Sequence, residues 1–233
     1  MALNVNTNVP SINAQRQLGI TNQQLTKSLE RLSSGLRINR AADDAAGLAI
    51  TSKMRTELNG YSQAVRNAND GISLIQTAEG SLNEVYNVLD RIRTISEQSA
   101  NGILGQEERD LIDTEFKELY AEIDRITQVA NFNGKKLLDG SISSASTAVS
   151  LQVGVKNTAN DRIAVRVDDV SASALGLGNN GTITTLSTQD MARSALDIVD
   201  SAISTISENR GRLGAQQNRL ESTIANINIT IEN

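Results

Sequence analysis

Residues that could support acid–base, nucleophilic or metal chemistry are scarce in this sequence. The 233 residues include no His, Cys or Trp, which excludes imidazole bases, thiolate nucleophiles and His/Cys metal sites. Among the carboxylates, Asp43 and Asp44 form an adjacent pair. Adjacent side chains on a helix point about 100° apart and do not converge on a substrate. We therefore expect this pair to begin a helix or to contact another copy of the chain. For the protein as a whole we predict no catalytic residue, no bound metal and no cofactor.

Two further motifs carry little chemical information. The segment Gly176–Gly178 lacks the third glycine of a dinucleotide-binding loop and the Gly-Lys-Ser/Thr of a phosphate-binding loop. The segment Asn180–Thr182 fits the acceptor pattern for N-glycosylation, which is frequent by chance. Aromatic residues make up 2% of the chain, whereas ligand pockets are usually rich in them. We therefore predict that the protein is not an enzyme.

The charge and hydropathy of the chain argue against two classes of partner. The formal net charge is -5 and the sequence pI is about 4.9, whereas nucleic-acid-binding proteins usually carry a basic patch. No stretch approaches the 18 apolar residues typical of a membrane-spanning helix. The first 20 residues are polar and do not resemble a secretory signal peptide. We expect neither nucleic acid nor membrane as a partner, and export, if it occurs, by another route.

The first 40 residues form a basic, amphipathic segment. The segment contains five Lys and Arg residues and a single acid, Glu30. Leucines recur in it at helical spacing, at Leu25, Leu29, Leu32 and Leu36. This pattern predicts a helix with one apolar face. The same composition is also typical of a transit peptide or of a helix that lies on a membrane surface.

Two long helices are predicted between residues 43 and 130. The first has a heptad seam and would be about 85 Å long at 1.5 Å per residue. Its apolar positions are Ile75, Ala78, Leu82, Val85, Leu89 and Ile92. Asn101, Gly102 and Gly105 interrupt this pattern, and a second seam then ends at the turn Asn131–Gly134. Its apolar positions are Ile112, Phe116, Leu119, Ile123, Ile126 and Ala130. We expect the second helix to pack antiparallel to the first.

The period changes between residues 140 and 186. Two runs of alternating residues predict a small β-hairpin that must lean on the helices. The apolar positions of these runs are Val149, Leu151, Val153 and Val155, and then Ile163, Val165 and Val167. A last helix is predicted from Ser187 as its N-cap, with Leu186 and Met191 forming a hydrophobic staple.

The apolar seam of this last helix would pass through Ala195, Ile198, Ala202 and Ile206, with a stutter between the last two. The sequence stops in the middle of the seam, without a helix stop signal. The predicted fold class is mainly α: a rod-like bundle of long antiparallel coiled-coil helices with a small β-hairpin.

Four segments of the chain are long and distinctive motifs: Leu32–Asn39, Asp43–Ile50, Asn67–Gly80 and Asn131–Leu138. In this order they resemble bacterial flagellin, the subunit of the flagellar filament. The resemblance is close over residues 1 to about 140 and looser over residues 187 to 233. The resemblance implies a structural subunit that polymerises with copies of itself into an extracellular filament for motility.

The resemblance also implies an organisation of the chain. Residues 1–42 would form an N-terminal core helix segment that is disordered unless assembled, and residues 43–233 would form the rod-like helical domain. Self-assembly residues would then include the four leucines named above together with Asp43 and Asp44. With only about 47 residues between Asp139 and Ser187, the chain resembles a core-only flagellin, and it resembles one that stops before the family's C-terminal core helix.

Further partners follow from the same resemblance. Flagellins are exported unfolded through the flagellar type III apparatus, without a cleaved signal peptide. Some are recognised by toll-like receptor 5, and by position Arg91, Ile95 and Glu115 match receptor-contacting sites. Two alternatives remain: a flagellar hook-filament junction protein, which would share these terminal helices, and a non-flagellar coiled-coil scaffold.

Overall fold

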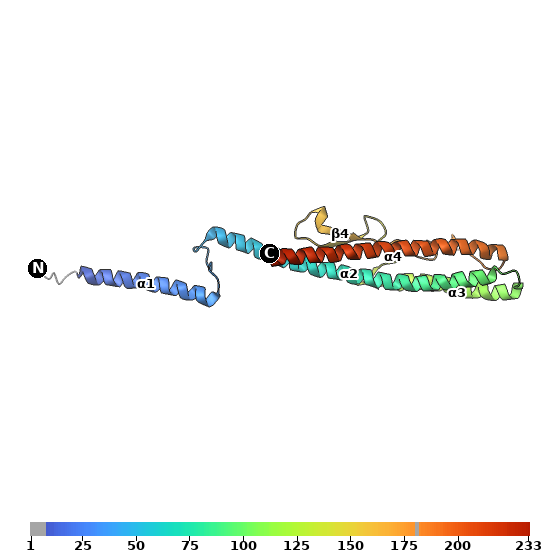
Figure 1. Cartoon of the computed structure of the whole chain (residues 1–233), viewed down its shortest axis with the longest axis horizontal. Coiled ribbons are helices and arrows are strands. Elements are labelled where there is room, and N and C mark those ends of the chain that lie inside the picture. Colours follow the sequence, from blue (N-terminus) through green and yellow to red (C-terminus); the bar gives the residue numbers. More distant parts are fainter. Residues whose placement is uncertain (1–7, 180–181) are drawn as a thin grey trace. The chain divides into compact units, whose positions relative to one another are not determined.

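The computed structural model describes residues 8–179 and 182–233, and the chain divides into two compact units, Met1–Asn59 and Gly60–Asn233. The boundary falls within the long helix α2 (Ala45–Ser99). We call the first part unit 1 and the second part unit 2, and each is described by itself. Figure 1 shows the helices and strands in chain order.

Unit 1 consists of helix α1 (Val9–Ser34), a loop and the beginning of α2. The side chain of Asn8 caps α1 by accepting a hydrogen bond from the Ser11 amide, and Pro10 lies in the first turn, where its missing N–H costs nothing. Helix α1 ends at Gly35, whose φ of 69° is the left-handed conformation that favours glycine. No residue of α1 is buried.

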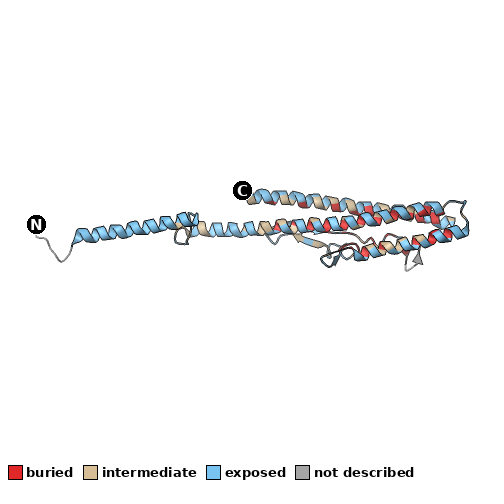
Figure 2. Cartoon of the chain, turned by 90° about the horizontal axis from the view of Figure 1, so that it is seen from below, coloured by how far each residue is buried: buried red, intermediate tan, exposed pale blue. Residues whose placement is uncertain are grey.

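Unit 2 is a bundle of three helices: the remainder of α2, α3 (Gln106–Val129) and α4 (Gln189–Glu232). All six predicted seam positions of α2 are buried. Arg93 of α2 pairs with Asp200 of α4, and Glu79 pairs with Arg210. Contacts therefore move toward the end of α4 as they move toward the start of α2, so these two helices are antiparallel. In Figure 2 the buried residues lie along the three helices of unit 2, whereas α1 is exposed along its length.

Short antiparallel strands complete unit 2. Strands β1 (Asn131–Phe132) and β2 (Lys135–Lys136) flank a turn in which Asn133 and Gly134 both have positive φ, as an Asn-Gly hairpin turn requires. Strands β3 (Val149–Gln152) and β4 (Arg162–Val165) form the hairpin predicted from the alternating valines, with a 3-10 turn, η1 (Ala159–Asp161), between them. Strands β5 (Gly178–Asn179) and β6 (Thr182–Ile183) form a third pair.

The hairpin of β3 and β4 leans on α2, as its small size demands. The side chain of Asn67 donates to the Gln152 carbonyl at 2.9 Å. A Cβ atom added at Gly71 would lie 2.2 Å from Cδ1 of Leu151, so this glycine lets β3 approach the helix closely. The predicted fold class, a mainly α bundle of long antiparallel helices with a small hairpin, is confirmed.

Three details of α4 differ from the sequence prediction. The N-cap is Thr188, which accepts from the Met191 amide, and not Ser187. Met191 is 48% exposed while Leu186 is buried, so the expected staple is not a core contact. Val199 is fully buried in place of Ile198, and the seam then steps regularly from Ala195 through Val199, Ala202 and Ile206. The predicted stutter is therefore wrong.

Candidate functional site

The leucines predicted to mediate assembly lie on the surface of unit 1. Leu25, Leu29, Leu32 and Leu36 are 56%, 55%, 81% and 43% exposed. The first three leucines belong to α1, and Leu36 follows its C-cap, Gly35. Val9, Ile12 and Leu18 of α1 are exposed as well. Scattered exposed apolar residues are ordinary, but a helix with this many apolar side chains and no buried residue has a surface suited to burial against another chain.

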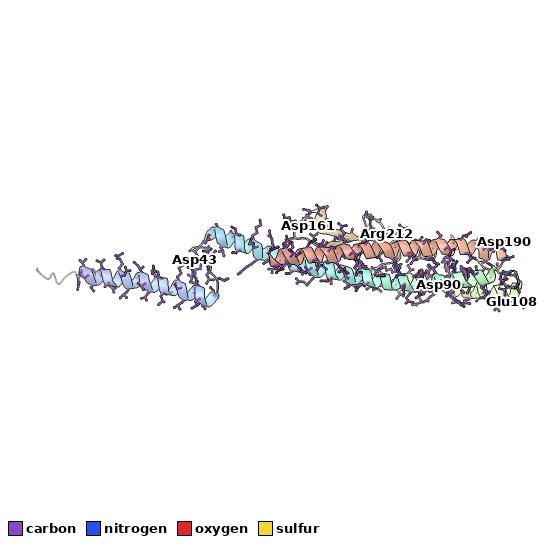
Figure 3. All side chains as sticks on the ribbon, viewed as in Figure 1. Asp43, Asp90, Glu108, Asp161, Asp190 and Arg212 are labelled. Carbon is purple, nitrogen blue, oxygen red and sulfur yellow. The ribbon has the colours of Figure 1, made fainter. Side chains whose placement is uncertain are left out.

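Asp43 holds the loop after α1 against the end of that helix. Its Oδ1 lies 2.6 Å from Lys27 Nζ, and its Oδ2 accepts hydrogen bonds from the backbone amides of Asn39 and Arg40 at 3.4 and 3.3 Å. The hydrogen bond from Lys27 lowers the pKa of Asp43 to about 2, against an opposing effect of desolvation. A second pair, Arg40 Nε with Glu30 Oε1 at 2.8 Å, fastens the same loop. Figure 3 labels Asp43 in this loop.

Asp44 has a different role from its neighbour. Its Oδ1 accepts a hydrogen bond from the Gly47 amide at 2.9 Å, and its carbonyl accepts from the Leu48 amide. This is the arrangement of an N-cap, so Asp44 begins α2. The two carboxylates therefore bind different partners and do not converge on one point. This arrangement agrees with the prediction that the pair begins a helix.

The positions that match receptor-contacting sites are placed unequally. Arg91 of α2 and Glu115 of α3 form an ion pair, with Nη2 to Oε1 at 2.5 Å and side chains 53% and 41% exposed. The two therefore lie together on the surface of unit 2, as the antiparallel packing predicted. Ile95 is fully buried. Its side chain lies beside the α2 seam, which continues from Ile92 to buried Ser96 by a step of four residues, and it packs in the hydrophobic core of unit 2. Ile95 is therefore not part of the surface that carries Arg91 and Glu115.

The sequence patterns did not identify two buried charged residues near the α2–α3 turn. Arg109 is 7% exposed and donates from Nη2 to the carbonyls of Asn101 and Leu104 at 2.7 and 3.2 Å. Asp113 is 6% exposed; it accepts from the Leu186 amide at 2.7 Å and pairs with Lys117. Both lie on the face of α3 that is otherwise apolar. A charged residue at such a position is the sequence signal that could have identified them. They hold the turn and the start of α4 in place.

The described residues offer no evident place for a metal. Over residues 8–179 and 182–233, no three Asp or Glu side chains gather in a cluster that could hold an ion. In that same part of the chain, no helix is long and apolar enough to cross a membrane. The glycosylation pattern at Asn180 lies outside the described residues.

Comparison with known proteins shows which family descriptions and which relatives match this chain. The family description "Bacterial flagellin N-terminal helical region" matches residues 5–143, and "Bacterial flagellin C-terminal helical region" matches residues 196–233. A flagellin from Halalkalibacterium halodurans is 44% identical over 98% of this chain and 81% of its own length. The flagellar filament 33 kDa core protein of Treponema phagedenis is 43% identical over 98% of this chain and 82% of its own length.

A solved structure agrees with the sequence matches. The crystal structure of Bacillus cereus flagellin superposes with a TM-score of 0.58 at 30% identity, covering 70% of this chain and 88% of that chain. The long helices, the exposed leucines and the four sequence motifs thus occur in a chain that aligns with these two flagellar relatives over 98% of its length. The chain belongs to the bacterial flagellin family.

Proposed function

We propose that this protein is a structural subunit that polymerises into the bacterial flagellar filament and so serves motility. The observation that carries the proposal is the exposed leucine face of α1, in a flagellin chain whose unit 2 already has its own closed core. A relative at 43% identity is itself named a flagellar filament core protein. We place the protein outside the cell, in the filament.

The organisation into residues 1–42 and 43–233 is part of the proposal. Helix α1 has no buried residue in the single chain, and an isolated helix is marginal in water because nucleation is costly. We propose that residues 1–42 become stably ordered when Leu25, Leu29, Leu32 and Leu36 are buried against neighbouring subunits. Asp43 and Asp44 would contribute by setting the loop and the start of α2 rather than by contacting the neighbour directly.

The proposed role requires no reaction. The chain has no His or Cys, so general acid–base and nucleophilic chemistry would have few residues to draw on. We propose that the protein is not an enzyme and that its work is mechanical, performed by the assembled filament.

Two further partners belong to the proposal and rest on the family. Export would use the flagellar type III apparatus, which passes unfolded subunits. Toll-like receptor 5 would contact the surface pair Arg91 and Glu115, without Ile95. Arg91→Ala should then weaken receptor binding about tenfold, because Arg is a frequent anchor of interfaces. Arg125→Ala is the matched control, since Arg125 also pairs with an acid on an exposed face. Equal affinities for the two variants would argue against this receptor surface.

Filament growth on seeds tests the main proposal. Short filament fragments from the source bacterium are mixed with the purified chain, and elongation is followed by sedimentation and negative-stain electron microscopy. We expect elongation along the length of existing filaments. A chain that only caps the seeds, without lengthening them, would indicate a junction protein. A chain that ignores the seeds and forms a discrete small oligomer would indicate a coiled-coil scaffold.

A further inference from the structure

Charge is divided unevenly along this chain. Residues 1–59 contain seven Lys and Arg and four Asp and Glu, whereas residues 60–233 contain fifteen and twenty-three. Unit 1 therefore carries +3 and unit 2 carries -8, which together give the formal charge of -5. In a polymer of identical chains, such a division favours contacts between unit 1 of one copy and unit 2 of another.

Unit 1 has a groove that presents part of this positive charge. It has a volume of about 510 Å³ and lies between the loop after α1 and the first turns of α2. Leu36 and Leu48 give it apolar walls, Thr51 adds a hydroxyl, and Arg37 and Arg55 bring guanidinium groups. The Arg37 side chain is 77% exposed, and its nearest carboxylate, on Asp44, is 4.0 Å away. Arg55 has no carboxylate within 4.0 Å in the part of the chain that the structure describes. This groove, which we call the arginine groove, suits an acidic and partly apolar ligand.

One end of unit 2 has the matching chemistry. Ile103, in the turn between α2 and α3, is 90% exposed, and Leu111, near the start of α3, is 73% exposed. Among the residues of unit 2 whose exposure the structure describes, these are the two most exposed large apolar side chains. Glu107 and Glu108 lie in the first turn of α3, and neither has a cationic side chain within 4.0 Å among the described residues. Figure 3 labels Glu108 at this end of the bundle. We call these four residues the acidic tip.

The backbone that carries the acidic tip is held by hydrogen bonds to the start of α4. Gln106 Nε2 donates to the Ser187 carbonyl at 3.0 Å, and Gln189 Nε2 donates to the Ala100 carbonyl at 2.9 Å. These bonds join the α2–α3 turn to the start of α4. Buried Arg109 fastens the turn from within. Binding through such a surface loses little conformational entropy.

We propose that the arginine groove of one subunit receives the acidic tip of a second copy of the chain. This inference rests on the proposed function, because it names a contact within the polymer. The guanidinium groups of Arg37 and Arg55 would pair with Glu107 and Glu108, since Arg binds carboxylates through a planar fork. Ile103 would cover the leucine walls. Groove and tip are different surfaces, so the contact is head-to-tail, and a head-to-tail contact builds an open filament when its rotation does not close a ring.

A charge exchange tests this contact. Arg55→Glu and Glu108→Arg are made separately and together in the full chain, and the critical concentration for elongation of filament seeds is measured. Each single reversal should raise the critical concentration about tenfold, because like charges then face each other across the contact. The double variant should return to within about threefold of the wild type, because the pair is restored with its signs exchanged.

Matched controls separate this contact from a general effect of charge. Lys53→Glu makes the same change on exposed α2 outside the groove, and Glu118→Lys makes the opposite change on exposed α3 away from the tip. Both should leave the critical concentration within about twofold of the wild type, as ordinary surface substitutions do. If the double variant is no better than the worse single variant, the arginine groove does not receive the acidic tip. Failure of the wild type to elongate seeds would instead overturn the proposed function.

Cysteine cross-linking provides a second readout that does not depend on assembly strength. The chain has no Cys, so Thr51→Cys and Ile103→Cys introduce the only thiols. When chains with one or the other substitution are mixed on seeds and oxidised, we expect a dimer that links one to the other. Thr51→Cys mixed with Val129→Cys is the control and should give none, because Val129 is exposed on α3 outside the tip. Equal yields from the two mixtures would contradict the proposed contact.

Discussion

Removing one apolar side chain from α1 should impair assembly without altering the fold of the single chain. Leu32 is 81% exposed, so Leu32→Ser removes almost no contact within the subunit. Burying a Leu side chain completely stabilises by about 1.5 to 3 kcal/mol. Covering the exposed four-fifths in the filament would then contribute about 1.2 to 2.4 kcal/mol. At 1.4 kcal/mol for each factor of ten, the critical concentration should rise roughly 7- to 50-fold.

The assay for Leu32→Ser combines two measurements on the same preparation. Seeded elongation gives the critical concentration, and thermal unfolding followed by circular dichroism reports on the bundle of unit 2. Val129→Ser is the control, because Val129 is also apolar, helical and 59% exposed. Its critical concentration should change by less than about twofold. An unchanged critical concentration for Leu32→Ser would refute the assignment of α1 to assembly. A thermal unfolding midpoint lowered as far as truncation of a buried core residue lowers it would refute the assignment as well.

Two further predictions concern the fold of each unit. Phe116→Ala should lower the free energy of unfolding by about 3 to 5 kcal/mol, because Phe116 is fully buried. Urea titration measures this loss; Leu111→Ala, on the exposed face of the same helix, should change stability by less than about 0.5 kcal/mol, and equal losses would contradict the assigned core. In unit 1, the folded pKa of Asp43 is lowered to about 2 from its usual 3.8, so its contacts are intact above about pH 4 and are lost as the pH falls toward 2. The amide resonances of Asn39 and Arg40 should therefore titrate with a midpoint near pH 2, absent in Asp43→Asn, whereas a midpoint near 4 would show that the loop is not held by this carboxylate.

Periodicity predicted most of the fold because unit 2 is built from local repeats. A heptad seam that is regular over many turns leaves one face for the core, and Leu82, Leu89 and Phe116 are fully buried as expected. Periodicity predicted the wrong buried residue where two neighbouring residues are both apolar. Ile198 and Val199 are both apolar, and only packing against the other helices decides that Val199 lies inside.

The candidate site was predicted less completely, for two physical reasons. Ile95 matches a receptor-contacting site by resemblance alone, and the heptad seam does not predict its burial because the seam position after Ile92 is Ser96. The contacts of Asp43 with Lys27 and of Glu30 with Arg40 depend on how the loop folds back onto α1, which no helical or strand period encodes. The N-cap role of Asp44 lies between these cases, because a carboxylate ahead of an apolar run is a local signal.

Immunogold labelling of intact cells of the source bacterium tests the central claim most directly. Antibodies raised against the hairpin region, residues 149–165, would be applied to wild-type cells and to cells that lack the gene. A filament subunit predicts gold particles along the length of the flagella and none in the deletion strain. Label confined to the base of each filament, or label inside the cell with unlabelled flagella, would contradict the account.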